Sequence, residues 1–453
     1  MKRFIQTIRN INKIEELRKR ILYTIGIILI YRFGSYVVLP GVDPNMLAAL
    51  KGQTSQGILG LLNMFSGGAF SNASVFALGI MPYISASIVV QLLGMAVPYF
   101  QKMQKEGESG RKKINQITRW LTVVITAFQA PGYIANLIHQ LPPEAISPFS
   151  PNVLSPSTFF WISSTIILTA GTLFVMWMGE KITDKGIGNG ISLLIMIGII
   201  ARLPFALFGE FVARMEEQGG GLVIFMVELV VLVLVILVCI LLVQGTRRIP
   251  VQYAKRIVGN KQYGGVRQYI PLKVNAAGVM PIIFAQAIMF IPITIAGFAS
   301  SETLTGFVSI FSDFNGFWYN FVFAVMIIAF TYFYTAVTIN PNQMAEEMKK
   351  NGGFIPGVKP GKKTADFLDE VMSRITFPGS LFLAFVAVMP AIARLFGINS
   401  QFAQFYGGTS LLILVGVVLD TLQQIESHLL MRHYDGLTKS GRIKGRSAVG
   451  IGA

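Results

Sequence analysis

The strongest constraint on this chain is a series of ten apolar windows, each long enough to cross a bilayer as a helix. A membrane span needs roughly 20 apolar residues, and its backbone N–H and C=O groups must find partners within the protein. The composition agrees, because 53% of the 453 residues are apolar and only 13% are charged, against roughly a quarter charged in a soluble domain. The sequence therefore predicts an all-α integral membrane protein with ten transmembrane helices, at residues 21–39, 75–99, 118–138, 159–179, 187–208, 222–243, 274–299, 317–339, 375–396 and 406–423.

The positions of the Lys and Arg residues predict the orientation, because short loops rich in positive charge stay on the cytoplasmic side. All but five of the 38 Lys and Arg residues fall in the N-terminal segment, in alternate loops or in the C-terminal tail. Both termini are therefore expected in the cytoplasm. The net charge of +16 would also suit a nucleic-acid binder, but topology and attraction to anionic lipids explain most of it.

A single membrane domain is expected, with no separate soluble domain. Residues 1–20 alternate apolar and basic positions at helical spacing, which predicts an amphipathic helix at the membrane surface rather than a cleaved signal peptide. Ten spans divide into five and five, and an odd number in each half means that any repeat is inverted in the membrane. The expected parts are an N-terminal half at 21–209, a C-terminal half at 210–425 with cytoplasmic loops at 245–273 and 340–374, and a cytoplasmic tail at 426–453.

Residues 57–74, between the first two spans, are rich in Gly and Ser and too short to cross a membrane. Irregular backbone at membrane depth is tolerated only where protein or a water-filled cavity surrounds it. A re-entrant segment beside a cavity and an ordinary external loop both fit these residues.

The sequence offers little support for catalysis. It has three scattered histidines, no G-x-x-x-x-G-K-[ST] phosphate loop and one cysteine, Cys239, so neither a cofactor nor a metal site is expected. Ionisable residues within the spans are few, the main ones being Arg32, Glu228 and Asp420. Glu228 suits a paired structural role better than a functional one. A secondary transporter for a small solute is the alternative to a passive channel, and an intramembrane enzyme is a more distant third.

Several strings, spread over nearly all spans, resemble the SecY family of protein-conducting channels. They are LGIMPYISASIVVQLL at 78–93, ITDKGIGNGISLL at 182–194, PLKVNAAGVMPIIFA at 271–285, NMFSGGA at 63–69, EGESGRKK at 106–113, RRI and YAKR within 247–256, GGFIPGVKPG at 352–361 and GGTSLLI at 407–413.

The resemblance implies an hourglass pore between two inverted five-helix halves, closed by a re-entrant plug at residues 57–74. Such a pore passes unfolded polypeptides and opens both across the membrane and sideways into lipid. Aliphatic side chains at the constriction hold back ions and water by dewetting. By matching positions, the pore ring is expected at Ile80, Ile84, Ile191, Ile195, Ile283 and Ile413, and the plug core at Asn63, Met64, Phe65, Ser66, Gly67 and Gly68.

The resemblance also implies a lateral gate and docking loops. Ser85, Ser87 and Gln91 are candidate gate residues, although ordinary packing between helices fits them equally well. Motor or ribosome docking is expected at the basic residues Arg247, Arg248, Lys255, Arg256, Lys349, Lys350 and Lys359, the last being Arg in most of the family. The implied partners are the small membrane subunits SecE and SecG, the motor ATPase SecA, the ribosome, signal-bearing precursor polypeptides and anionic lipids, at the bacterial plasma (inner) membrane.

Overall fold

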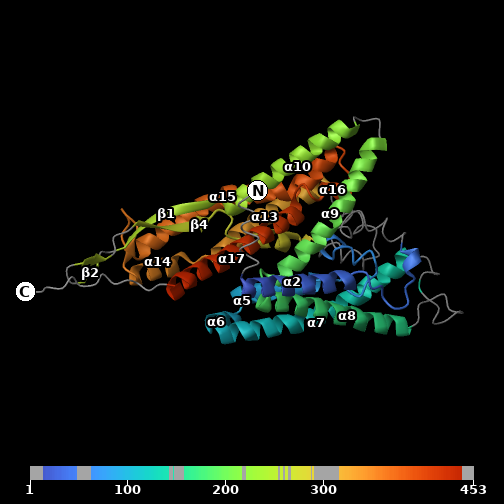
Figure 1. Ribbon diagram of the computed structural model, residues 1–453, viewed down its shortest axis with the longest axis horizontal. Coiled ribbons are helices and arrows are strands. Elements are labelled where there is room, and N and C mark those ends of the chain that lie inside the picture. Colours follow the sequence, from blue (N-terminus) through green and yellow to red (C-terminus); the bar gives the residue numbers. More distant parts are fainter. Residues whose placement is uncertain are drawn as a thin grey trace, which may run out of the picture.

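The chain is mostly helical (Figure 1). The computed structural model describes residues 14–47, 63–141, 146, 158–216, 221–253, 256–258, 261–263, 267–286, 288–289 and 316–440. Within these residues, seven helices are long and apolar enough to span a bilayer, and the bent pair α5 and α6 raises the number to eight. The multi-span membrane fold is confirmed, and the count of ten stays a prediction.

The helices form two groups that meet along α9 (Gly190–Glu216). The first group, side by side in the lower part of Figure 1, holds α2 (Glu15–Gly34), α5 (Met81–Ala96), α6 (Pro98–Lys105), α7 (Glu108–Gln140) and α8 (Thr158–Lys185). The second holds α10 (Gly221–Gln244), α13 (Phe317–Thr338), α15 (Lys362–Leu395), α16 (Ser400–Ala403) and α17 (Gly408–Ser440). Helix α9 packs on α8 in the first group and on α10 and α17 in the second. Helix α9 runs unbroken through residue 209, and the division of the chain into two halves there stays a prediction.

Several predicted spans belong to helices that are longer than their apolar windows, among them α7, α15 and α17. Helix α15 begins 13 residues before the predicted span at 375–396, and α17 runs on into the predicted tail. The extra part of α15 buries Ala365, Leu368 and Met372 at spacings of three and four residues, so it is an amphipathic helix that a search for apolar windows misses. The predicted seventh span is helical over 280–286, and its later part lies outside the described residues.

The first span ends earlier than predicted. Helix α2 stops at Gly34 instead of continuing to residue 39, and the aromatic ring of Phe76 occupies the space where a Cβ on Gly34 would lie. The chain then pairs with a later segment, since the backbone N–H of Leu39 donates to the carbonyl of Ala73 at 2.8 Å. A short 3-10 helix, η1 (Pro44–Met46), follows. Because α2 already begins at Glu15, the end of the predicted amphipathic segment belongs to the span helix, and residues 1–13 lie outside the described residues.

The second span is also shorter than the predicted window at 75–99. Helix α5 begins at Met81 with Pro82 in its first turn, where a missing N–H is harmless. It ends at Ala96, and the next residue, Val97, has an extended backbone (φ −111°, ψ 121°) that is typical of a residue before proline. Helix α6 starts at Pro98 after a bend of 101°.

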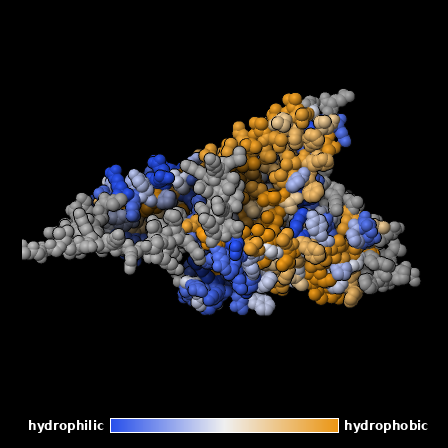
Figure 2. All heavy atoms as spheres, viewed as in Figure 1, coloured by the Kyte–Doolittle hydropathy of each residue, from blue (hydrophilic) through white to orange (hydrophobic). Residues whose placement is uncertain are grey.

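The two large cytoplasmic loops of the prediction are joined into one small β-subdomain. The strands are β1 (Thr246–Tyr253), β2 (Arg256–Val258), β3 (Lys261–Tyr263), β4 (Arg267–Lys273) and β5 (Gly353–Phe354), accompanied by helix α14 (Pro341–Lys350). Strand β1 lies between β4 and β5 in an antiparallel sheet, and β2 pairs with β3. Val251, Leu272, Met348 and Leu368 are among the buried residues of its core. Polar side chains gather over this region, whereas apolar atoms cover the helices above α9 (Figure 2).

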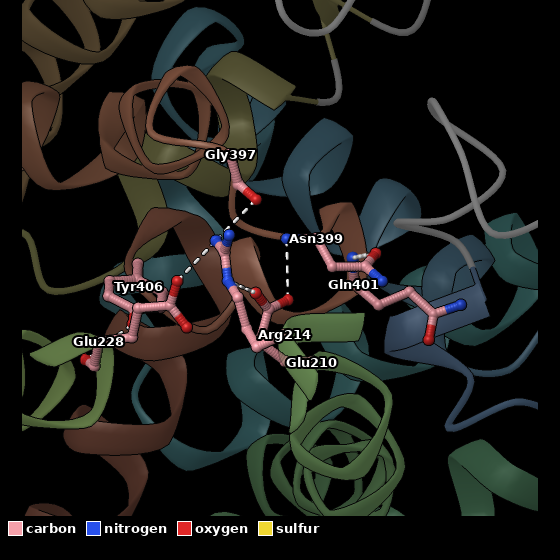
Figure 3. A network of polar contacts seen from close by, with 7 residues as sticks. All are labelled: Glu210, Arg214, Glu228, Gly397, Asn399, Gln401 and Tyr406. Carbon is pink, nitrogen blue, oxygen red and sulfur yellow. Dashed lines mark hydrogen bonds and ion pairs between the residues drawn. The ribbon is translucent and has the colours of Figure 1, made fainter. Parts of the chain in front are cut away.

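A buried ion-pair network ties α9 to the second helix group (Figure 3). The guanidinium of Arg214 donates to Oε1 of Glu210 at 3.0 Å and to Oε1 of Glu228 at 2.7 Å. It also donates to the carbonyl of Gly397 at 2.8 Å, and the backbone N–H of Asn399 donates to the second oxygen of Glu210 at 2.9 Å. The pairing of Glu228 with Arg214 confirms the structural interpretation of this carboxylate.

We expect Arg214→Met to destabilise the fold strongly. Removing one partner of a buried ion pair leaves uncompensated carboxylates, which costs about 3–5 kcal/mol. The matched control is Lys112→Met, which breaks the exposed pair between Lys112 and Glu108 and should leave stability nearly unchanged. Thermal unfolding of the purified protein in detergent measures both, and equal losses in the two variants would contradict a special role for the network.

Candidate pore seal and plug site

Residues 63–68, the predicted plug core, are all buried and hydrogen-bonded among themselves and their neighbours. They begin with one helical turn at 63–65 and continue as turns. Asn63 accepts from the backbone N–H of Ser71 through Oδ1 at 3.0 Å, and Gly68 N–H donates to the Asn63 carbonyl at 2.8 Å. The hydroxyl of Ser66 accepts from the N–H of Phe70 at 3.1 Å. The segment therefore satisfies much of its own backbone, as a buried irregular segment must.

This segment belongs to the same buried cluster as most of the predicted pore ring. Met64 and Phe65 share one buried cluster with ring residues, and further ring residues pack against that cluster. The ring residues brought together here are Ile80, Ile191, Ile195, Ile413 and Ile84. Ile283 is half-buried and is not among the residues that pack against this cluster. We call the cluster formed by Met64, Phe65 and these five isoleucines the aliphatic seal.

A close backbone contact between Gly67 and Gly198 holds the predicted plug segment against α9. A Cβ placed on Gly67 would lie 2.8 Å from the Cα of Gly198, closer than such atoms approach. Gly67 also has a φ of +65°, a left-handed conformation that glycine adopts freely. The two glycines allow the plug backbone to touch the helix, which a side chain at either position would prevent.

Four side chains from the surrounding helices reach the plug segment. Arg32 of α2 donates through Nη1 to the Gly67 carbonyl at 2.6 Å, and Tyr133 of α7 donates to the Phe70 carbonyl at 2.9 Å. Two weaker contacts come from Tyr31, whose hydroxyl lies 3.4 Å from the Ser66 carbonyl, and from Ser410, whose hydroxyl lies 3.1 Å from the Met64 sulfur. Sequence reasoning identified Arg32 as an unusual charge within a span but gave it no partner.

The predicted lateral-gate residues lie on α5. Ser85, Ser87 and Gln91 are half-buried, and the Ser85 hydroxyl donates to the Met81 carbonyl of its own helix at 3.2 Å. The side-chain oxygen of Gln91 is buried and has no hydrogen-bond partner among the described residues. The opposite side of the predicted gate, the seventh span, is described only in part, so the gate assignment stays a prediction.

The predicted docking residues gather on the β-subdomain. Arg247 and Arg248 are exposed on β1, Lys349 and Lys350 are exposed at the end of α14, and Lys359 is exposed in the turn that follows β5. Arg256 lies on β2, and Lys255 lies outside the described residues. The pairing of β1 with β5 therefore places basic residues from two predicted loops on one subdomain. Over the described ranges, no group of His, Cys, Asp or Glu side chains is arranged to hold a metal ion.

Comparison with known proteins gives matches over almost the whole chain. The SecY family matches residues 74–422. The protein translocase subunit SecY of Streptomyces coelicolor is 43% identical over 432 residues, which cover 94% of this chain and 98% of that protein. The protein translocase subunit SecY of Mycobacterium bovis is 42% identical over 451 residues, which cover 96% of this chain and 99% of that protein.

Solved structures share the fold at low sequence identity. A structure described as that of a protein conducting channel aligns with a TM-score of 0.58 at 16% identity, covering 94% of this chain and 95% of that one. Sec61 in the canine ribosome-channel complex from the endoplasmic reticulum aligns with a TM-score of 0.55 at 15% identity, with the same two coverages. With the family match and the 43% identity to a translocase subunit, we conclude that the chain belongs to the SecY family.

Proposed function

We infer that this chain is the central pore-forming subunit of a protein-conducting channel. It passes unfolded secretory polypeptides across the plasma membrane and releases membrane-protein segments sideways into lipid. Membership of the SecY family, whose members are translocase subunits rather than enzymes, gives the class of function. The observation that carries the proposal in this chain is the aliphatic seal, in which five predicted ring isoleucines belong to or pack against one buried cluster with Met64 and Phe65, from a segment that is hydrogen-bonded within itself.

The seal suits a pore that must be tight to ions and still admit a polypeptide. Apolar constrictions exclude water and ions by dewetting, without offering a binding site in which an ion could dwell. The aliphatic contacts are non-directional, so side chains can move aside and close again around a chain of any sequence. The bonds of Asn63 and Ser66 lie inside the plug segment and can travel with it. We propose that the plug leaves the pore as a unit.

A sideways exit is proposed between α5 and the seventh span. Ser85, Ser87 and Gln91 lie on the α5 side, and polar contacts between helices in membranes are worth about 1 kcal/mol each. Such contacts hold two faces together and still allow an apolar signal segment to displace them.

The driving force is proposed to come from partners on the cytoplasmic side. The chain has no phosphate-binding loop, so work must come from the motor ATPase SecA or from the translating ribosome, with SecE and SecG as small membrane subunits. The exposed basic residues of the β-subdomain, with Arg247 and Lys349 as examples, suit acidic partner surfaces or RNA phosphates. The charge pattern supports a cytoplasmic location of both termini and suits a bacterial inner membrane with anionic lipids.

Reconstitution tests the proposal directly. The chain is placed in vesicles with its small membrane subunits, and the motor, ATP and a signal-bearing precursor are added. We expect ATP-dependent protection of the precursor from external protease. Uptake of small solutes without any precursor protection would instead favour the transporter alternative.

The ring assignment predicts that Ile413→Asn increases ion leakage through the channel. A polar amide wets the constriction, whereas Ile413 is buried in the seal. Val418→Asn is the matched control, because Val418 lies on the same helix and is partly exposed outside the seal. Conductance in planar bilayers should rise several-fold for the first variant and stay near the parent value for the second. Equal conductance in the two would rule out Ile413 as a ring residue.

The docking assignment predicts that reversing the charge at Arg247, Arg248 and Lys349 weakens partner binding. Exposed charges act mainly on electrostatic attraction, so the loss should be largest at low salt and shrink as salt rises. Binding of motor and of ribosomes to vesicles containing the channel measures it. Reversal of Lys112, an exposed basic residue of α7 far from β1 in sequence, serves as the control. A loss independent of salt would point to misfolding of the subdomain instead.

A further inference from the structure

Arg32 is an ionised residue within an apolar helix, and its surroundings are unusual. It lies near the end of α2 and is half-buried. An arginine at membrane depth is costly to bury and normally pairs with an acidic side chain or a carbonyl. Among the described residues, no carboxylate lies within ion-pair distance of its guanidinium, in contrast to Arg214 and Arg119, which both have acidic partners.

The acceptors of Arg32 are the plug and one tyrosine. Nη1 donates to the Gly67 carbonyl at 2.6 Å, the shortest of the contacts between the plug and the described helices. Nη2 donates to the hydroxyl of Tyr36 at 2.8 Å, and the guanidinium lies 4.9 Å from the centre of the same ring. A backbone carbonyl of the plug therefore supplies the main negative dipole that faces this charge.

The other side-chain hydrogen bonds between the surrounding helices and the plug, which we call the plug boundary, involve weaker donors or acceptors. Those from Tyr31 and Tyr133 are between neutral groups, and the contact of Ser410 is to a thioether, which is a poor acceptor. A hydrogen bond from an ionised donor is roughly twice as strong as one between neutral groups. The contact of Arg32 with Gly67 is thus the strongest single directional tie across the boundary.

We propose that Arg32 is a positioning residue that holds the plug in its closed place, a regulation of the pore that rests on the proposed function above. When the plug leaves, the Gly67 carbonyl leaves with it and the guanidinium keeps only Tyr36. The closed state is therefore favoured by the need to solvate a charge within the membrane. Loss of one charge-assisted hydrogen bond corresponds to at least about a tenfold change in the ratio of closed to open plug.

Accessibility of a cysteine in the plug measures this ratio. Ser66, which is buried, is replaced by Cys in a Cys239→Ala background, and the complete channel complex is kept in sealed vesicles oriented with the outer face exposed. A membrane-impermeant maleimide then labels Cys only when the plug has left its place. Arg32→Gln in this background is expected to raise the labelling rate about tenfold, and Arg32→Lys, which keeps the charge but loses the two-pronged geometry, by less.

Tyr36→Phe is the matched control, because it removes the other acceptor of Arg32 and leaves the contact with Gly67 intact. It should change labelling by less than about twofold. Thermal unfolding of each variant identifies general loss of the fold, which would increase labelling of any buried cysteine. A second reporter, Ser164→Cys on α8, where Ser164 is fully buried far from the plug in sequence, should stay unlabelled in every variant.

Two outcomes would overturn the proposal. Labelling of Arg32→Gln at the parent rate would mean that the contact does not hold the plug, and equal increases in Tyr36→Phe and Arg32→Gln would mean that Arg32 acts through α2. Both results are separate from failure of the proposed function, which is measured by precursor protection in the parent channel. If the parent channel translocates the precursor but Arg32→Gln does not change the labelling rate, the inference about Arg32 is wrong and the proposed function still stands.

Discussion

The arrangement of the two helix groups depends on the packing of α9 between them. In its first third, Ile195 lies in the aliphatic seal and Gly198 touches the backbone of the predicted plug segment. At its end, Arg214 binds Glu228 of α10 and the loop that precedes α16. A single helix therefore contacts the seal, the plug and the neighbouring half, so any relative movement of the two groups must change at least one of these contacts.

The start of α9 shows how this helix is fixed at its other end. Three backbone N–H groups that no helical bond can satisfy are met by side chains from three helices. Thr24 of α2 accepts from Ile187, Thr183 of α8 accepts from Gly190, and Gln424 of α17 accepts from Gly188. Gly190 has no room for a side chain, because a Cβ would lie 2.0 Å from the Gly179 carbonyl. The glycine-rich string at 186–190 thus serves close packing and not phosphate binding.

Hydropathy predicted most of the fold because the membrane imposes one simple rule on helix length. The window at 317–339, for example, matches α13 within one residue. The rule fails for helices that extend beyond their apolar window, as in the amphipathic first part of α15. It also fails for strands that pair over a long sequence separation, since β1 pairs with β5 about a hundred residues later. The seal positions could be predicted only from the family motifs, because the sequence around an isoleucine does not show whether its side chain lines a pore or packs against another helix. The partners of Arg32 and Arg214 on other segments could not be predicted from the sequence, because only the fold brings those segments together.

The plug boundary and the plug interior use different interactions, and this difference bears on how the pore can open. Inside the segment, Asn63 and Ser66 satisfy backbone groups and stay bonded wherever the segment goes. Across the boundary, most contacts are aliphatic and re-form readily, while directional bonds are few. Under the proposed function, burial of apolar surface would set the tightness of the pore against ions, and the few directional bonds would set how often the plug departs. Tightness and ease of opening would then change separately, because different residues would determine each of them.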